Sequence, residues 1–129
     1  MANWNFCRYT LLCEDAQEAE KIASTISEWL TLENPEGINW QSPWIGLVAL
    51  GSGIATWENG ALNPDYKYGG CFEEEPEVSD NIVLLSTQWK WEPHHEIMVD
   101  CINKMWPNVE LLYSSELDNA DDKLTNDES

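Results

Sequence analysis

The stretch NIVLLSTQWKW at residues 81–91, followed by EPHHEIMVDCINKMWP at residues 92–107, carries a strong strand pattern and then a helix pattern. Residues 81–91 begin with a run of aliphatic residues and then place Thr and Trp at alternate positions, which predicts a central strand with apolar residues on both faces. Pro93 suits the first position of a helix, and an apolar stripe at helical spacing follows it as far as Pro107. The stretch therefore predicts a buried strand that leads into an amphipathic helix.

The N-terminal part of the chain predicts a second strand and helix pair. Residues 3–13 alternate well enough to form a strand that is partly apolar on both faces. Asp15 precedes a run of apolar residues at spacings of three and four, and Glu18 completes a capping-box start. We expect this helix to close at residues 34–37, Asn-Pro-Glu-Gly.

The middle and the end of the chain predict further strands. Residues 44–50 are predicted to form a largely buried strand, and residues 54–57 another, after which Asn59-Gly60 predicts a tight turn. Residues 62–80 are expected to be mostly irregular, with a short strand near residues 67–73, and residues 109–113 predict a last strand. The order of elements indicates an α+β two-layer sandwich, in which two helices pack on one face of an antiparallel sheet.

Length and composition predict a single folded domain with an acidic tail. The 129 residues include 8 Trp and are 43% apolar, which fits a chain with a real core. Residues 116–129 hold six acids and Lys123 among small polar residues, so we expect a flexible tail after a domain of residues 1–115. With neither an apolar run long enough to span a bilayer nor a leader-like N-terminus, a cytoplasmic protein without a membrane partner is expected.

Two stretches resemble the ferredoxin-like domain of the YubB-like proteins of plasmids and phages. The first is Ala2-Asn3-Trp4-Asn5-Phe6-Cys7-Arg8-Tyr9-Thr10, which is similar to the N-W-C segment of that family. The second is Ser86-Thr87-Gln88-Trp89-Lys90-Trp91-Glu92-Pro93, which is similar to its Thr-x-Trp turn into the second helix. The resemblance covers about half of the chain and implies a ferredoxin-like fold and a mobile-element origin. It carries over no catalytic residue.

The charge of the chain narrows the class of partner. The 24 Asp and Glu residues exceed the 6 Lys and Arg residues by 18, and residues 1–115 alone keep a net charge of -13. The basic residues stand singly along the chain, so direct nucleic-acid binding is not expected, because its stacking platforms lie in positively charged grooves. A folded body this acidic exceeds what solubility requires, and it favours a basic protein partner.

Residues that often carry chemistry do not form a recognisable catalytic or metal motif. The four cysteines, Cys7, Cys13, Cys71 and Cys101, lack a C-x-x-C pair and are expected to be reduced and buried. His94 and His95 are adjacent rather than four residues apart, so they are expected to be solvent-exposed polar residues of the first helical turn. We predict no catalytic residue, no metal site and no cofactor, and therefore no enzyme.

The acids at residues 73–100 are the candidate partner-binding residues. Glu92, Glu96 and Asp100 stand at a spacing of four, so on a helix they would stack about 6 Å apart on the solvent face, opposite the apolar stripe. The loop acids lie just upstream in sequence and are interpreted as extending that surface. The candidates are Glu73, Glu74, Glu75, Glu77, Asp80, Glu92, Glu96 and Asp100.

A row of carboxylates can present a basic groove with charges that resemble a phosphate backbone. The first hypothesis is therefore a non-catalytic phage or mobile-element inhibitor of a basic, nucleic-acid-binding host defence protein, of the anti-CRISPR or anti-restriction type. Two alternatives are an interaction module with an exposed Trp-rich patch and an acidic face that serves solubility alone. An enzyme with an acidic metal site is the least favoured hypothesis.

Overall fold

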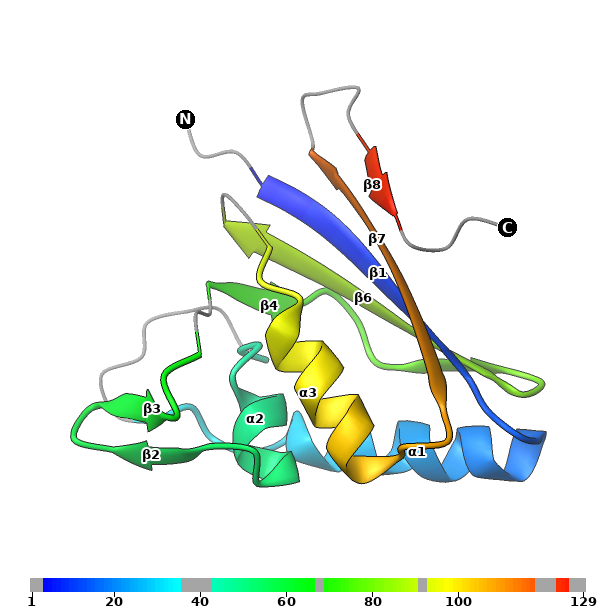
Figure 1. Ribbon diagram of the computed structural model, residues 1–129, viewed down its shortest axis with the longest axis horizontal. Coiled ribbons are helices and arrows are strands. Elements are labelled where there is room, and N and C mark those ends of the chain that lie inside the picture. The colour runs from blue at the N-terminus through cyan, green and yellow to red at the C-terminus, as the bar shows by residue number, and fades with distance from the viewer. Residues whose placement is uncertain (1–3, 36–42, 67–68, 91–92, 118–122, 126–129) are drawn as a thin grey trace.

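The computed structural model describes residues 4–35, 43–66, 69–90, 93–117 and 123–125 (Figure 1). The larger sheet is antiparallel and has the strand order β4-β6-β1-β7-β8, and β5 also pairs with β6. Its strands are β1 (Trp4–Leu12), β4 (Gly70–Phe72), β5 (Glu77–Ser79), β6 (Ile82–Lys90), β7 (Glu110–Leu117) and β8 (Lys123–Thr125). The central strand predicted over residues 81–91 is confirmed, because β6 lies between β1 on one side and β4 and β5 on the other.

The two central strands turn one face toward the helices. Every second residue of β6 from Val83 to Trp89 is buried, and the residues between them are half-buried. Tyr9 of β1 lies opposite Leu85 in the ladder and is also fully buried. This alternation is typical of an antiparallel sheet with one covered face.

Helix α1 (Ala16–Trp29) starts with a variant of the predicted capping box, in which Glu18 reaches back to the residue before the cap residue Asp15. The Asp15 carboxylate accepts a hydrogen bond from the backbone N–H of Glu18 at 2.8 Å, and the Glu18 carboxylate accepts one from the N–H of Glu14 at 2.7 Å. The helix ends at Trp29, before the predicted stop at residues 34–37. Its buried residues, Ala19, Ile22, Ala23, Ile26 and Trp29, form the face that meets the sheet.

The predicted strand over residues 44–50 is wrong, because most of that run forms helix α2 (Leu47–Ser52). Gly46 precedes the helix, and Gly53, at a φ of 81°, ends it in the left-handed conformation that glycine tolerates. Trp44 makes an isolated β-bridge with Cys71. A short apolar run between glycines suits a buried helix as well as a buried strand, so its periodicity alone does not separate the two.

A hairpin of β2 (Thr56–Glu58) and β3 (Ala61–Asn63) follows α2. The predicted turn is confirmed, since Asn59 and Gly60 both have positive φ angles, of 55° and 79°. The short strand expected near residues 67–73 is β4, and the region expected to be irregular also contains β3 and β5.

Helix α3 (Glu96–Met105) carries the predicted apolar stripe but begins later than Pro93. The N–H of Ile97 donates to the carbonyl of His94, and the N–H of Met98 donates to that of His95, so both histidines precede the regular helix. The stripe of Ile97, Met98, Cys101 and Ile102 is buried. The helix packs against α2.

The three helices lie together on one side of the larger sheet (Figure 1). Their buried residues and the buried face of β1 and β6 form one continuous core. The protein is therefore α+β with an antiparallel sheet, and the described residues have α2 in addition to the two predicted helices. At the C-terminal end, β7 continues to Leu117 and β8 pairs with it, so the predicted domain boundary at residue 115 falls inside a strand.

Candidate acidic binding surface

The first group of candidate acids lies between β4 and β6. Glu73, Glu74 and Glu75 are exposed in the loop that follows β4, and we call these three residues the acidic loop. Glu77 begins β5, and Asp80 occupies the turn into β6 with a φ of 54°; both are exposed. The sequence predicted this cluster of exposed acids but not the neighbour that it contacts.

That neighbour is the end of α1, which forms a groove with the acidic loop. The groove has a volume of about 200 Å³, and its lining is mostly apolar. It is lined by Ser27, Leu30, Thr31, Pro43, Glu73, Glu74, Glu75 and Pro76. No motif in the sequence indicated this site, because its walls come from three segments that are far apart along the chain.

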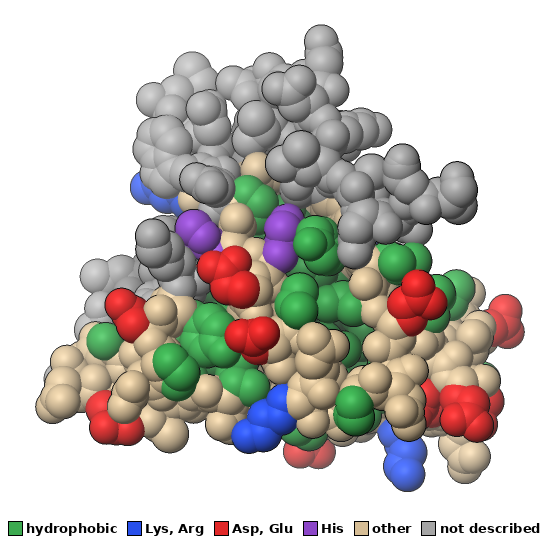
Figure 2. Space-filling model, viewed as in Figure 1, with side chains coloured by type: hydrophobic (Ala, Val, Ile, Leu, Met, Phe, Trp, Pro, Cys, Tyr) green, Lys and Arg blue, Asp and Glu red, His purple; other side chains and the backbone are tan. Residues whose placement is uncertain are grey.

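The second group of candidate acids lies on α3. Glu96 is the first residue of the helix, and Asp100 follows one turn later; we call these two the α3 acidic pair. Figure 2 shows acidic side chains beside the histidines on the face that carries α3. Glu92 lies outside the described residues, and the predicted helix start at Pro93 is wrong, since α3 begins at Glu96; of the predicted row, Glu96 and Asp100 are thus the described members on the helix.

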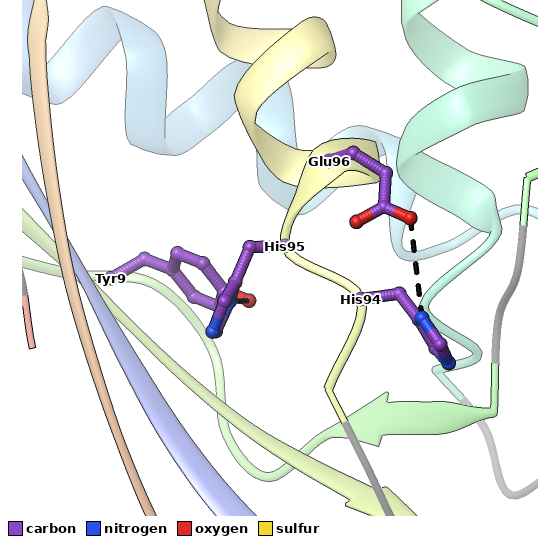
Figure 3. A network of polar contacts seen from close by, with 4 residues as sticks. All are labelled: Tyr9, His94, His95 and Glu96. Atoms are coloured by element: carbon purple, nitrogen blue, oxygen red, sulfur yellow. Dashed lines mark hydrogen bonds and ion pairs between the residues drawn. The ribbon is translucent and has the colours of Figure 1, made fainter. Parts of the chain in front are cut away.

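Both members of the α3 acidic pair have polar neighbours. The hydroxyl of Tyr66 donates to Oδ2 of Asp100 at 2.7 Å. Nδ1 of His94 lies 3.9 Å from Oε1 of Glu96, and Figure 3 shows the two side chains facing each other. Burial, followed by the hydrogen bond to Asp100, raises the pKa of Tyr66 to about 12.

The structure places the two groups of acids against different helices. α1 packs on β5, β6 and α2, whereas α3 packs on α2. The acidic loop shares its groove with α1, and the α3 acidic pair contacts Tyr66 and His94. The acids that were interpreted from the sequence as one surface therefore form two acidic regions.

Lysine and arginine do not neutralise these acids in the described part of the chain. Among the described residues, the ion pair within 4.0 Å is that between His94 and Glu96. The ammonium group of Lys104, for example, donates to the backbone carbonyl of Gly53 at 3.2 Å. Within these residues, the exposed carboxylates thus face solvent without a lysine or arginine partner.

A cluster of Tyr9, His95 and Tyr113 joins the start of α3 to the sheet. The hydroxyl of Tyr9 and Nδ1 of His95 are hydrogen-bonded at 2.7 Å (Figure 3). The rings of His95 and Tyr113 stack with their centroids 4.2 Å apart. The prediction that both histidines are exposed is therefore wrong, since His95 is half-buried and His94 is also partly covered. Tyr9 is 86 positions away in the chain, so no local pattern could reveal this contact.

Burial controls the protonation of this cluster. Burial lowers the pKa of His95, although the neighbouring Glu96 opposes the change, and so the neutral ring is favoured. Burial raises the pKa of Tyr9 far above its usual range. At neutral pH both rings are therefore uncharged, and the hydrogen bond between Tyr9 and His95 is structural.

The cysteines occupy the buried positions that the sequence predicts. Cys7, Cys13, Cys71 and Cys101 are all buried, and burial raises the pKa of Cys101 to about 12. A thiol that stays protonated is a poor nucleophile and a poor metal ligand. In the described segments, no group of three or more His, Cys, Asp or Glu side chains is placed to hold a metal ion.

Most of the described tryptophan rings belong to the core. Trp29, Trp44 and Trp89 are buried, and Trp57 and Trp106 are partly buried against the core cluster. Trp29 stacks on Trp106 with ring centroids 5.7 Å apart. Among the described tryptophans, Trp57 and Trp106 are therefore the ones with surface left for an exposed patch.

The chain matches no family model, and no curated protein or solved structure matches it. Over the described residues, none of the helices has the length and apolar character needed to cross a membrane.

Proposed function

We propose that this protein is a non-catalytic acidic binding protein that occupies the nucleic-acid-binding surface of a basic partner. The observation that carries the proposal is the set of exposed carboxylates without a lysine or arginine ion pair on the described surface. An anti-CRISPR or anti-restriction inhibitor from a phage or another mobile element is the concrete form of this function.

Charge physics favours such a partner over a neutral one. Carboxylates already paired with lysine or arginine would lose those contacts on binding, whereas unpaired ones lose only water and counterions. A basic groove that pairs with such a surface displaces the cations that surround the carboxylates, and the release of these counterions favours binding as it does on DNA. The long-range field of a chain with a net charge of -18 also accelerates the encounter.

The arrangement of the strands supports a ferredoxin-like core as the finer fold assignment. The order β4-β6-β1-β7, with α1 and α3 in the two connections, follows the split β-α-β pattern of that fold. On this assignment α2, β2 and β3 are an insertion after the first helix, while β5 and β8 extend the sheet. Such a core is common to many functions, so the proposed partner rests on the charged surface and not on the fold.

The test is competition with DNA. This protein, immobilised on a resin, would first capture a basic DNA-binding protein from a host lysate. The captured partner would then be purified and bound to fluorescent duplex DNA. We expect this protein to displace the DNA, and its own affinity for the purified partner, measured without DNA, to weaken at least tenfold between about 50 and 200 mM salt. An affinity that does not change with salt, or capture of a partner that keeps its DNA, would contradict the proposal.

Charge-reversed variants locate the effect. Glu96→Lys with Asp100→Lys, and separately Glu74→Lys with Glu75→Lys, change the net charge by the same amount. A pair of exposed acids outside both regions, Glu20→Lys with Glu110→Lys, is the matched control. We expect at least one of the first two variants to lose displacement tenfold or more, and the control to lose less than threefold, with all variants folded by circular dichroism.

A further inference from the structure

The groove between α1 and the acidic loop has the size of a single side chain. Its volume of about 200 Å³ lies below the roughly 300–1,000 Å³ of sites that enclose drug-sized ligands. Leu30, Pro43 and Pro76 supply apolar lining, and the exposed acids of the acidic loop form part of its wall. A long side chain with an aliphatic stem and a polar end fits this combination better than a cofactor does.

Backbone hydrogen bonds hold the walls of the groove in place. The N–H of Phe72 donates to the carbonyl of Pro43 at 2.9 Å, which fixes Pro43 beside the loop. The N–H of Glu73 donates to the carbonyl of Ser86 on β6 at 2.9 Å, which ties the first loop acid to the sheet. On the α1 side, the hydroxyl of Thr31 donates to the carbonyl of Glu28 at 2.6 Å. The groove is therefore formed before any partner arrives.

The charge around the groove is negative from both walls. The C-terminal end of a helix carries partial negative charge, and the last turn of α1 contains no basic residue to offset it. The acidic loop adds three exposed carboxylates on the opposite wall. The complementary occupant is a cation.

We propose that this groove binds an arginine side chain of the protein partner. The aliphatic stem would pack on Leu30, Pro43 and Pro76, and the guanidinium would pair with carboxylates of the acidic loop. Arginine suits such a site because its planar, weakly hydrated fork pairs with carboxylates in two-point geometry, whereas the lysine ammonium is compact and strongly hydrated. This inference rests on the proposed function for the existence of a basic partner, and it names the residue type that the partner inserts.

A pair of short peptides tests the groove without the partner. The blocked peptide Gly-Arg-Gly is compared with Gly-citrulline-Gly, which keeps the shape of the side chain and lacks its charge. Each peptide is titrated into isotopically labelled protein, and the amide resonances are followed by NMR. The arginine peptide should shift the resonances of Leu30, Thr31 and the acidic loop. Citrulline should bind at least fivefold more weakly, and equal binding of the two peptides would overturn the proposal.

Three variants distinguish binding in the groove from a general effect of the acidic charge. Glu74→Gln with Glu75→Gln removes charge from the groove, while Glu77→Gln with Asp80→Asn removes the same charge from exposed acids that do not line it. Ser27→Phe fills the groove and leaves the charge unchanged. We expect the first and third variants to weaken the arginine peptide at least fivefold and the second less than twofold; equal losses in the two charge variants would contradict the proposal.

The outcomes distinguish this inference from the proposed function. If folded Ser27→Phe protein displaces DNA from the partner as well as the parent does, the groove proposal fails and the proposed function stands. If the arginine peptide binds in the groove but the protein displaces no DNA, the proposed function fails, and the groove is upheld as an arginine-binding site alone.

Discussion

The acidic loop and the α3 acidic pair have similar charge but different surroundings. Asp100 accepts a hydrogen bond from Tyr66, and Glu96 lies near His94, so the pair on α3 has polar neighbours within the chain. The loop carboxylates instead border an apolar groove at the end of α1. The α3 region is also joined to the core through the hydrogen bond of His95 with Tyr9.

Charge alone therefore does not rank the two regions as binding sites. Carboxylates that already accept hydrogen bonds must exchange them for contacts with a partner, so their net gain is smaller. Carboxylates beside a preformed apolar groove can combine charge with burial of an aliphatic stem. The acidic loop is therefore the stronger candidate for recognition, and the α3 acidic pair for long-range attraction.

The largest expected effect comes from breaking the support of the acidic loop with Gly70→Ala. A Cβ atom at this position would lie 2.5 Å from the backbone carbonyl oxygen of Gln88, so β4 has to move away from β6. Overpacking of this kind costs about 1–3 kcal/mol. We expect a matching fall in the free energy of unfolding by urea denaturation, together with loss of the arginine-peptide signal.

Ser79→Ala is the control for this variant, since Ser79 is exposed on β5 at the same side of β6. It should change stability by less than about 0.5 kcal/mol. A Gly70→Ala protein with unchanged stability would mean that the close approach of β4 to β6 does not hold the loop.

The second prediction breaks the link between α3 and the sheet. Tyr9→Phe removes the hydroxyl that bonds His95 and leaves a half-buried ring nitrogen to find a new partner, at a cost of about 1–2 kcal/mol. Urea denaturation measures the loss. Because the acidic loop is held by β4 and α1, arginine-peptide binding should stay within twofold of the parent, and a larger change would show that the two regions are coupled.

The sequence predicts only part of the contrast between the two acidic regions, because some of the contacts join residues that are far apart along the chain. Local patterns sufficed for the capping box of α1, the strand β6 and the Asn59-Gly60 turn, because each depends on residues within a few positions. The run at residues 44–50 was assigned wrongly, because a short buried run has no period that separates helix from strand.

The candidate site depends more strongly on distant contacts. The exposed acids could be predicted from composition, but the groove needs the end of α1 to meet residues 43 and 73–76. The role of His95 depends on Tyr9, on a strand at the other end of the chain. Neither contact leaves a spacing signal in the sequence, so the structure was needed to tell the two acidic regions apart.

The third prediction uses pH to sharpen the same contrast. Burial holds the pKa of His95 below its ordinary value of 6.5, so the unfolded state binds more protons than the folded state as pH falls through that range. Stability should therefore decline as the pH is lowered from about 7.5 to 5.5. His95→Gln should flatten this part of the profile, measured by urea denaturation at each pH, and His94→Gln is the matched control.

A slope that survives in the His95→Gln protein and vanishes in the His94→Gln protein would contradict the assignment. Arginine-peptide binding should show no corresponding step, because the acidic loop lies against α1 and not against His95.

The smallest expected effect concerns the hydrogen bond that engages the α3 acidic pair. Burial and the bond to Asp100 raise the pKa of Tyr66 to about 12, against 10.0 for an ordinary tyrosine. Any stability from this group is therefore present below pH 10 and is lost as pH rises toward 12.

Asp100→Asn should lower the pKa of Tyr66, measured as phenolate absorbance relative to a Tyr66→Phe reference. Glu96→Gln should lower it less, because Asp100 contributes both a hydrogen bond and a charge while Glu96 contributes the weakest of the charge effects. An equal response to both substitutions would mean that Asp100 is as unengaged as the carboxylates of the acidic loop, and the distinction between the two regions would then rest on the groove alone.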